Sequence, residues 1–264
     1  MKLMPIRFIG RSFLSFLRYL GELVLLAADT ARSIFTAPIR WRLFFSQVLE
    51  VGFRSQLVVI MTGAFTGAVF AAQTFFQFHS LGMDSAVGSV VAVSMFRELG
   101  PVLTGLMVAG RVGAAMSAEI GTMKVTEQID ALRALGVYPV DYLVVPRTLA
   151  MMVSMPLLVA ECVGIGIVAG YLVGVGLLDI PAVYYVHYMQ KFTGIRDIKM
   201  ALTKGFVFAF LIVFISCHQG LNAKEGAVGV GRAPTEAVVI GSLAILVSNF
   251  FLSLLLNVVF PYGG

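Results

Sequence analysis

The sequence predicts an all-α integral membrane protein, with an N-terminal interfacial amphipathic helix followed by five transmembrane helices. Two observations carry this prediction. Of the 264 residues, 59% are hydrophobic and 12% are charged, whereas a soluble domain has about 25% charged residues. The apolar residues also gather in five runs, and about 20 such residues cross a bilayer as a helix. Five helices of this kind leave no room for a second soluble domain.

Residues 1–54 are predicted to form an N-terminal interfacial and elbow region. Polar side chains recur every three or four positions along one side of a helix: Arg7, Arg11, Ser15, Arg18 and Glu22. Large apolar side chains occupy the opposite side: Phe13, Phe16, Leu17 and Leu20. This pattern is typical of a helix lying in the membrane interface, and a helix packed on a protein core remains the alternative.

Residues 55–264 are predicted to form one domain of five transmembrane helices. The five apolar runs are residues 55–78, 85–110, 148–178, 205–220 and 237–264. The fourth run is short and is expected to extend back through Ala201. Glycines spaced by four predict close packing between helices, within the bundle or in a homodimer: Gly63, Gly67, Gly166, Gly170 and Gly174.

Lys and Arg residues favour the cytoplasmic ends of transmembrane helices. A cytoplasmic N-terminus places fourteen of the nineteen in residues 1–54, 111–147 and 221–236. Four remain for the opposite side: Lys191, Arg196, Lys199 and Lys204. The C-terminus then lies on the opposite, outer side of the membrane. Since the basic residues adjoin membrane spans, we expect them to attract anionic lipid, and no nucleic-acid partner is expected.

The connection between the second and third runs is the most polar stretch of the chain. Residues 118–136 are predicted to form a short amphipathic helix on the cytoplasmic side, ended by Gly136 and Pro139. It serves either as a plain connector or as a docking surface for a soluble partner. The charged candidates for coupling to an ATPase are Glu119, Lys124, Glu127, Asp130 and Arg133.

Arg97 and Glu98 are adjacent charges in the otherwise uncharged second run. Neighbouring helical residues point about 100° apart, so each needs its own partner, cavity or water. Pro101 lacks the N–H that would bond to the carbonyl of Arg97, which predicts a free carbonyl and a bend. The pair forms either a structural ion pair with another helix or the polar lining of a substrate cavity. Gln73 in the first run is a further candidate for substrate binding, and an interhelical hydrogen bond is its alternative.

No motif for chemistry on the chain itself is apparent. Glu161 is expected to be structural, and Cys162 and Cys217 lie in apolar runs, where they are expected to be buried thiols. The three histidines show no metal-ligand spacing, and no P-loop is present. We therefore expect no cofactor, no metal and no catalytic residue, and ATP hydrolysis by another chain.

Two stretches resemble a known family. The sequence FRELGPVLTGLMVAGRVGAAMSAEIGTMKVTEQIDAL at residues 96–132 and GAVGVGRAPTEAVV at 226–239 are similar to MlaE (YrbE)-type permeases of ABC lipid transporters. The stretch DALRALG at 130–136 also resembles the coupling loop of ABC importers, although the proline follows at a different spacing. The similarity covers nearly the whole chain, including its order of one interfacial helix and five spans.

The resemblance implies a bacterial inner-membrane permease that works as a homodimer. Two ATPase subunits would bind the coupling helices, a periplasmic MCE-domain protein would contact the other face, and a STAS-domain protein could join the ATPase. The implied substrate is a phospholipid, and in this family the glutamate corresponding to Glu98 lines the lipid pocket.

Two other function classes remain as alternatives. The first is a stand-alone proton-coupled secondary carrier with Glu98 as the proton site, although no inverted repeat is apparent. The second is a membrane-embedded lipid enzyme, for which the sequence offers no nucleophile or metal constellation.

Overall fold

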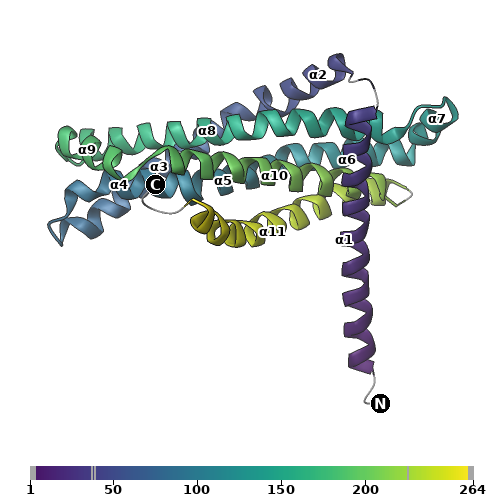
Figure 1. Ribbon diagram of the computed structural model, residues 1–264, viewed down its shortest axis with the longest axis horizontal. Coiled ribbons are helices and arrows are strands. Elements are labelled where there is room, and N and C mark those ends of the chain that lie inside the picture. The colour runs from purple at the N-terminus through teal and green to yellow at the C-terminus, as the bar shows by residue number, and fades with distance from the viewer. Residues whose placement is uncertain (1–3, 37, 39, 225, 261–264) are drawn as a thin grey trace.

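The computed structural model describes residues 4–36, 38, 40–224 and 226–260. All regular structure within these residues is helical, which confirms the all-α prediction. Five helical runs are long and apolar enough to cross a membrane: Trp41–His79, Asp84–Val125, Val140–Gly176, Ile195–Leu221 and Val228–Val259. They form an elongated bundle, and the N-terminal helix α1 lies across one of its ends (Figure 1).

Most of the spans are built from several consecutive helices. The first contains α2 (Trp41–Val51), η1 (Phe53–Ser55) and α3 (Gln56–His79). The second contains η2 (Asp84–Ala86), α4 (Val87–Ser94), η3 (Met95–Leu99), α5 (Gly100–Val108), η4 (Ala109–Gly113) and α6 (Ala114–Val125). The short α7 (Gln128–Ala134) leads into the third, made of η5 (Val140–Val144) and α8 (Val145–Gly176). After α9 (Ala182–Phe192), α10 (Ile195–Leu221) and α11 (Ala227–Val259) provide the last two.

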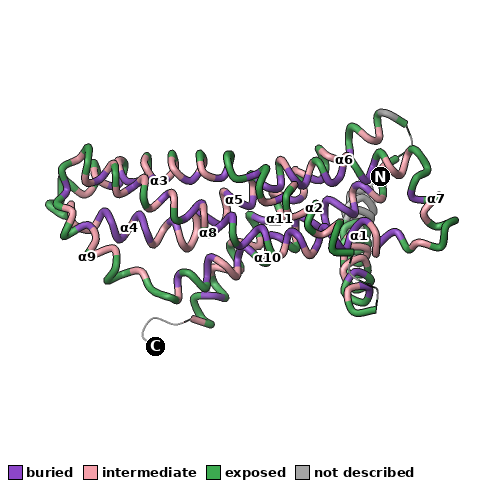
Figure 2. Tube along the Cα trace, turned by 90° about the horizontal axis from the view of Figure 1, so that it is seen from above, coloured by how far each residue is buried: buried purple, intermediate pink, exposed green. Residues whose placement is uncertain are grey.

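Close packing between α3 and α8 organises the bundle. A methyl group on Gly67 would lie 2.0 Å from the carbonyl oxygen of Gly166, and one on Gly63 would lie 2.6 Å from that of Cys162. The spaced glycines therefore allow close contact between two helices of the same chain, which is the first of the two roles predicted for them, the other being contact in a homodimer. Buried residues follow the interior of the bundle (Figure 2). Among the spans, α10 is the most buried and α11 the least.

Helix α1 (Met4–Thr36) packs on the bundle through one stripe of its surface. Glu22 contacts His218 of α10 at 3.0 Å, and Ser33 donates a hydrogen bond to Asp141 of η5. The apolar side chains that the sequence placed on the opposite face are exposed: Phe13, Phe16, Leu17 and Leu20. The interfacial position of this helix stays a prediction, and the side chains of Arg7 and Arg11 lie outside the described residues.

Several charged residues assigned to connections lie within the helical runs, so their assignment to loops was wrong, and three of them have polar partners inside the bundle. Arg111 belongs to η4 and donates to Ser55 at 2.7 Å. Arg147 belongs to α8, where it is buried and paired with Glu119. Lys204, assigned to the far side, is buried inside α10. Since each of these cations has a polar partner within the bundle, uncharged runs underestimate the spans. The predicted end of the last span, residues 261–264, lies outside the described residues.

The prediction of one helix over residues 118–136 was also wrong. Helix α6 extends to Val125, and the helical conformation is interrupted at Glu127, whose φ of 59° is left-handed. Helix α7 then begins in a new direction, so that Ile129 becomes buried. Gly136, with a φ of 72°, ends the turn that follows. The result is a short helix that projects from the end of the bundle near α1 and α2 (Figure 1).

Candidate functional site: a charged cluster within the bundle

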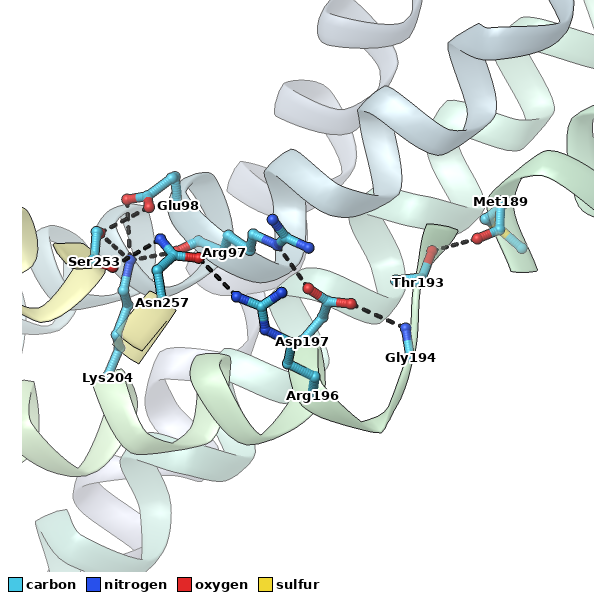
Figure 3. Close-up of polar contacts among 10 residues, drawn as sticks. All are labelled: Arg97, Glu98, Met189, Thr193, Gly194, Arg196, Asp197, Lys204, Ser253 and Asn257. Atoms are coloured by element: carbon cyan, nitrogen blue, oxygen red, sulfur yellow. Dashed lines mark hydrogen bonds and ion pairs between the residues drawn. The ribbon is translucent and has the colours of Figure 1, made fainter. Parts of the chain in front are cut away.

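Four charged side chains from two spans meet inside the bundle (Figure 3). The second span contributes Arg97 and Glu98 from the π-helical turn η3, and α10 contributes Asp197 and Lys204. A π-helical turn inserts an extra residue in a helix and is common at functional sites. Here Pro101 follows two residues after the turn ends, and it removes one backbone donor from the next turn.

Lys204 connects the two spans. Its ammonium group is completely buried and lies 3.0 Å from the Glu98 carboxylate. The same group donates to the carbonyl oxygen of Arg97, the acceptor that Pro101 leaves without its usual helical donor. The sequence predicted that this carbonyl would accept no hydrogen bond from within its own helix, and Lys204 supplies the hydrogen bond instead.

Glu98 is held by donors from α11 as well. Asn249 donates from Nδ2 to its Oε2 at 2.7 Å, and Ser253 donates to its Oε1 at 2.8 Å. Even so, the Glu98 side chain remains 44% exposed. The carboxylate is therefore fixed in position by three donors while one side stays open to the surroundings of the bundle.

Arg97 has a separate partner, as the angular separation of adjacent helical residues requires. Its Nε donates to Asp197 at 2.6 Å. The second oxygen of Asp197 accepts the backbone N–H of Gly194 at 2.9 Å, which caps the start of α10. Asp197 is buried, so this ion pair is shielded from solvent.

The cluster sums to zero formal charge, with two cations facing two anions. Charges within a membrane are stable only when paired or facing a cavity, and removal of one partner from a buried pair is costly. The arrangement can hold the second span, α10 and α11 together. It can also exchange a partner of the open Glu98 carboxylate for a polar group of a ligand.

The other predicted site residues lie apart from this cluster. Gln73 is exposed on α3, a helix that supplies none of the described partners of Arg97 or Glu98. Glu161 is partly buried in α8. Cys162 and Cys217 are free and buried, as predicted.

Sequence reasoning missed Asp197, Lys204 and the polar residues of α11. One usable signal was present. Asn249, Ser253 and Asn257 recur at intervals of four within an otherwise apolar run, which places three polar side chains on one helical face. Asn257 accepts a hydrogen bond from Arg196 at 2.8 Å, and Ser253 contacts Glu98 and Lys204 (Figure 3).

The candidate coupling residues divide into two groups. Around α7, Asp130 pairs with Arg133 at 3.0 Å and with Lys124 at 3.6 Å, and Glu127 occupies the left-handed turn. Glu119 is separate, because it pairs with buried Arg147 at 2.7 Å. Next to α7, Leu135 and Tyr138 expose apolar surface at the tip of the projection. The tip thus combines charges with apolar side chains, as protein-binding surfaces do.

Comparisons with known proteins agree with this architecture. The family model described as Permease MlaE matches residues 44–255. A probable ABC transporter permease protein of Rickettsia felis is 44% identical over 93% of this chain and 95% of its own length. A probable ABC transporter permease protein of Synechocystis is 42% identical over 80% of each chain. The Arabidopsis thaliana chloroplastic protein TRIGALACTOSYLDIACYLGLYCEROL 1 is 36% identical over 87% of this chain and 65% of its own length.

Proposed function

The chain belongs to the MlaE permease family, and we propose on this basis that it is the transmembrane subunit of an ABC-type phospholipid transport system. The permease moves lipid between the inner membrane and a periplasmic MCE-domain protein, and a separate ATPase supplies the energy. The observation that carries the lipid assignment is the fixed, half-exposed Glu98 carboxylate within an apolar span. The Arabidopsis relative, which is named for a galactose-bearing diacylglycerol lipid, supports a lipid substrate in the wider sense.

Glu98 and Arg97 are the proposed polar contacts for the lipid headgroup, with Gln73 as a further contact. Helix α11 is the least buried span and carries two of the donors that hold Glu98. A lipid, or a second permease subunit in a homodimer, would cover this side. Movement of α11 would release Glu98 for a headgroup, which gives the cluster a role in transport beyond stability.

The α7 projection is the proposed contact for the ATPase. Lys124, Glu127, Asp130 and Arg133 lie on or beside it, and Glu119 anchors α6 to α8 through Arg147. This end is proposed to be cytoplasmic, so the N-terminus is inside and the C-terminus is periplasmic. A STAS-domain protein bound to the ATPase completes the proposed assembly.

The test uses the complex purified from its native membrane, with co-purifying proteins and bound lipids identified by mass spectrometry. Reconstituted in vesicles, it should transfer labelled phospholipid only when ATP is present. Glu98→Gln leaves buried Lys204 without its counter-charge and should lower stability. In the complex that assembles it should reduce transfer by about tenfold or more, whereas Glu161→Gln, which alters another carboxylate within a span, should leave it unchanged. Transport by the permease alone, driven by a proton gradient, would instead establish the carrier alternative with Glu98 as its proton site.

A further inference from the structure

Two adjoining cavities lie along helix α2, at the end of the bundle that carries α7. The larger, of about 550 Å³, is lined by α2, α6, α7, η5 and α8, and the smaller, of about 180 Å³, by α2, η4 and α6. They share Gln47 and Glu119, so together they form one groove, which we call the α2–α6 groove. Small-molecule sites have volumes of about 300–1,000 Å³, and the larger cavity alone falls in this range.

The groove carries charges of both signs. Arg147 lines the larger cavity and Arg111 the smaller, while Glu119 lines both and Glu50 lines the smaller. The side chain of Arg147 is 4% exposed, whereas that of its partner Glu119 is 59% exposed. The cation is therefore fixed and its carboxylate partner is free to move away.

Arg147 also has unused hydrogen-bonding capacity. Its Nη1 donates to the carbonyl of Leu143 at 2.7 Å and its Nη2 contacts Glu119 at 2.7 Å. Within the described residues its buried Nε has no acceptor, and a buried donor without a partner is unfavourable. Guanidinium groups bind phosphate through paired donors, so a phosphate replacing Glu119 would satisfy more of this side chain.

The surroundings of the groove are those of a membrane interface. Trp41 at the start of α2 is exposed, and the guanidinium of Arg40 lies 4.8 Å from the ring centre of Tyr142, which lines the groove. Tryptophan, tyrosine and basic residues gather at the level of lipid headgroups. Apolar residues of the lining, among them Leu43 and Met123, provide room for the glycerol end of a lipid.

We propose that the α2–α6 groove binds the headgroup of a zwitterionic phospholipid, with the phosphate on Arg147 and the amine on the displaced carboxylate of Glu119. This exchange keeps every charge paired. The site is separate from the Glu98 cluster, which lies beside α9 toward the other end of the bundle (Figures 1 and 3). Lipid binding in the groove requires only that a phospholipid bilayer surrounds the bundle. Because it does not depend on transport, it can still be tested if the proposed transport function fails.

The first test is photolabelling of the full-length protein in nanodiscs of equal parts phosphatidylethanolamine and phosphatidylglycerol. A trace of phosphatidylethanolamine carries a diazirine near its glycerol, and labelled peptides are mapped by mass spectrometry. Gln47→Trp, which fills both cavities, should reduce labelling of the groove by about tenfold or more. Leu49→Trp is the matched control, because Leu49 is exposed on the same helix and lines neither cavity. If Gln47→Trp does not yield folded protein, Thr122→Trp fills the larger cavity from α6.

The second test separates the amine contact from the phosphate contact. Unlabelled phosphatidylethanolamine should compete better than phosphatidylglycerol, and Glu119→Gln should remove that preference, whereas Asp84→Asn in η2 should keep it. Displacement of the probe by millimolar inorganic phosphate alone would show a phosphate site and overturn the zwitterion proposal. Unchanged labelling of Gln47→Trp would also overturn it, and loss of the ATPase from that variant would then identify the groove as a protein-docking surface.

Discussion

The ammonium of Lys204 lies 3.0 Å from the carboxylate of Glu98, and both groups lie within membrane spans. Lys204 is the fully buried member of the pair, so it cannot recover solvation when its partner is removed. Glu98 retains exposed surface and further donors on α11. The two residues therefore differ in their surroundings: Lys204 is enclosed by the cluster, and Glu98 keeps one side of its carboxylate exposed.

Replacement of Lys204 by methionine should destabilise the bundle, but by less than the about 3–5 kcal/mol of a charge left alone in a fully buried pair, because Glu98 is 44% exposed and keeps its donors on α11. The change also leaves the Arg97 carbonyl without its donor. The double variant Lys204→Met/Glu98→Gln should recover a large part of this loss, because the uncompensated carboxylate is gone. Thermal or denaturant unfolding in detergent measures the coupling. Additive effects of the two substitutions would contradict an energetically important pair.

Gly67→Ala should separate α3 from α8. The added methyl group would lie 2.0 Å from the backbone carbonyl oxygen of Gly166, which cannot rotate away, and overpacking of this kind costs about 1–3 kcal/mol. Gly164→Ala in α8 is the control, since its methyl group meets nothing within 4 Å. Alanine favours a helix over glycine by about 1 kcal/mol, so the control should be neutral or stabilising. Equal unfolding temperatures for both variants would refute the close-contact interpretation.

More of the fold than of the candidate site could be predicted from the sequence. The five spans follow from apolar runs, and the separate partners of Arg97 and Glu98 follow from helix geometry. The identity of those partners did not follow, because Asp197 and Lys204 are distant in sequence and charged residues were taken as span boundaries. Similarly, helical periodicity continues through residue 127, and a non-glycine residue with positive φ carries no local signal there.

Reversal of charge on α7 should impair coupling to the ATPase without unfolding the permease. The Asp130–Arg133 pair is exposed and contributes only about 0.2–0.5 kcal/mol to the helix, so Asp130→Lys should fold normally. We expect weaker binding of the ATPase and reduced lipid-stimulated ATP hydrolysis.

The exchange Asp130→Arg/Arg133→Asp distinguishes the two possible causes of that defect. It restores the ion pair within α7 but reverses the surface presented to a partner. A docking role predicts that the double variant remains defective, whereas full recovery would show that the pair serves only the helix itself.

Acid should loosen the attachment of α1 to α10. Hydrogen bonds, first from His218 and then from Arg18, hold the pKa of Glu22 below its ordinary value. A lowered pKa means that folding favours the ionised form, so the contribution of Glu22 is complete above its unfolded pKa of about 4.3. It is lost as the pH falls through the lower folded value. Spin labels on α1 and on the adjacent end of α10 should therefore move apart below about pH 4. Glu22→Gln should show a distance that no longer depends on this pH step, and a step of the same size in that variant would assign the change to another group.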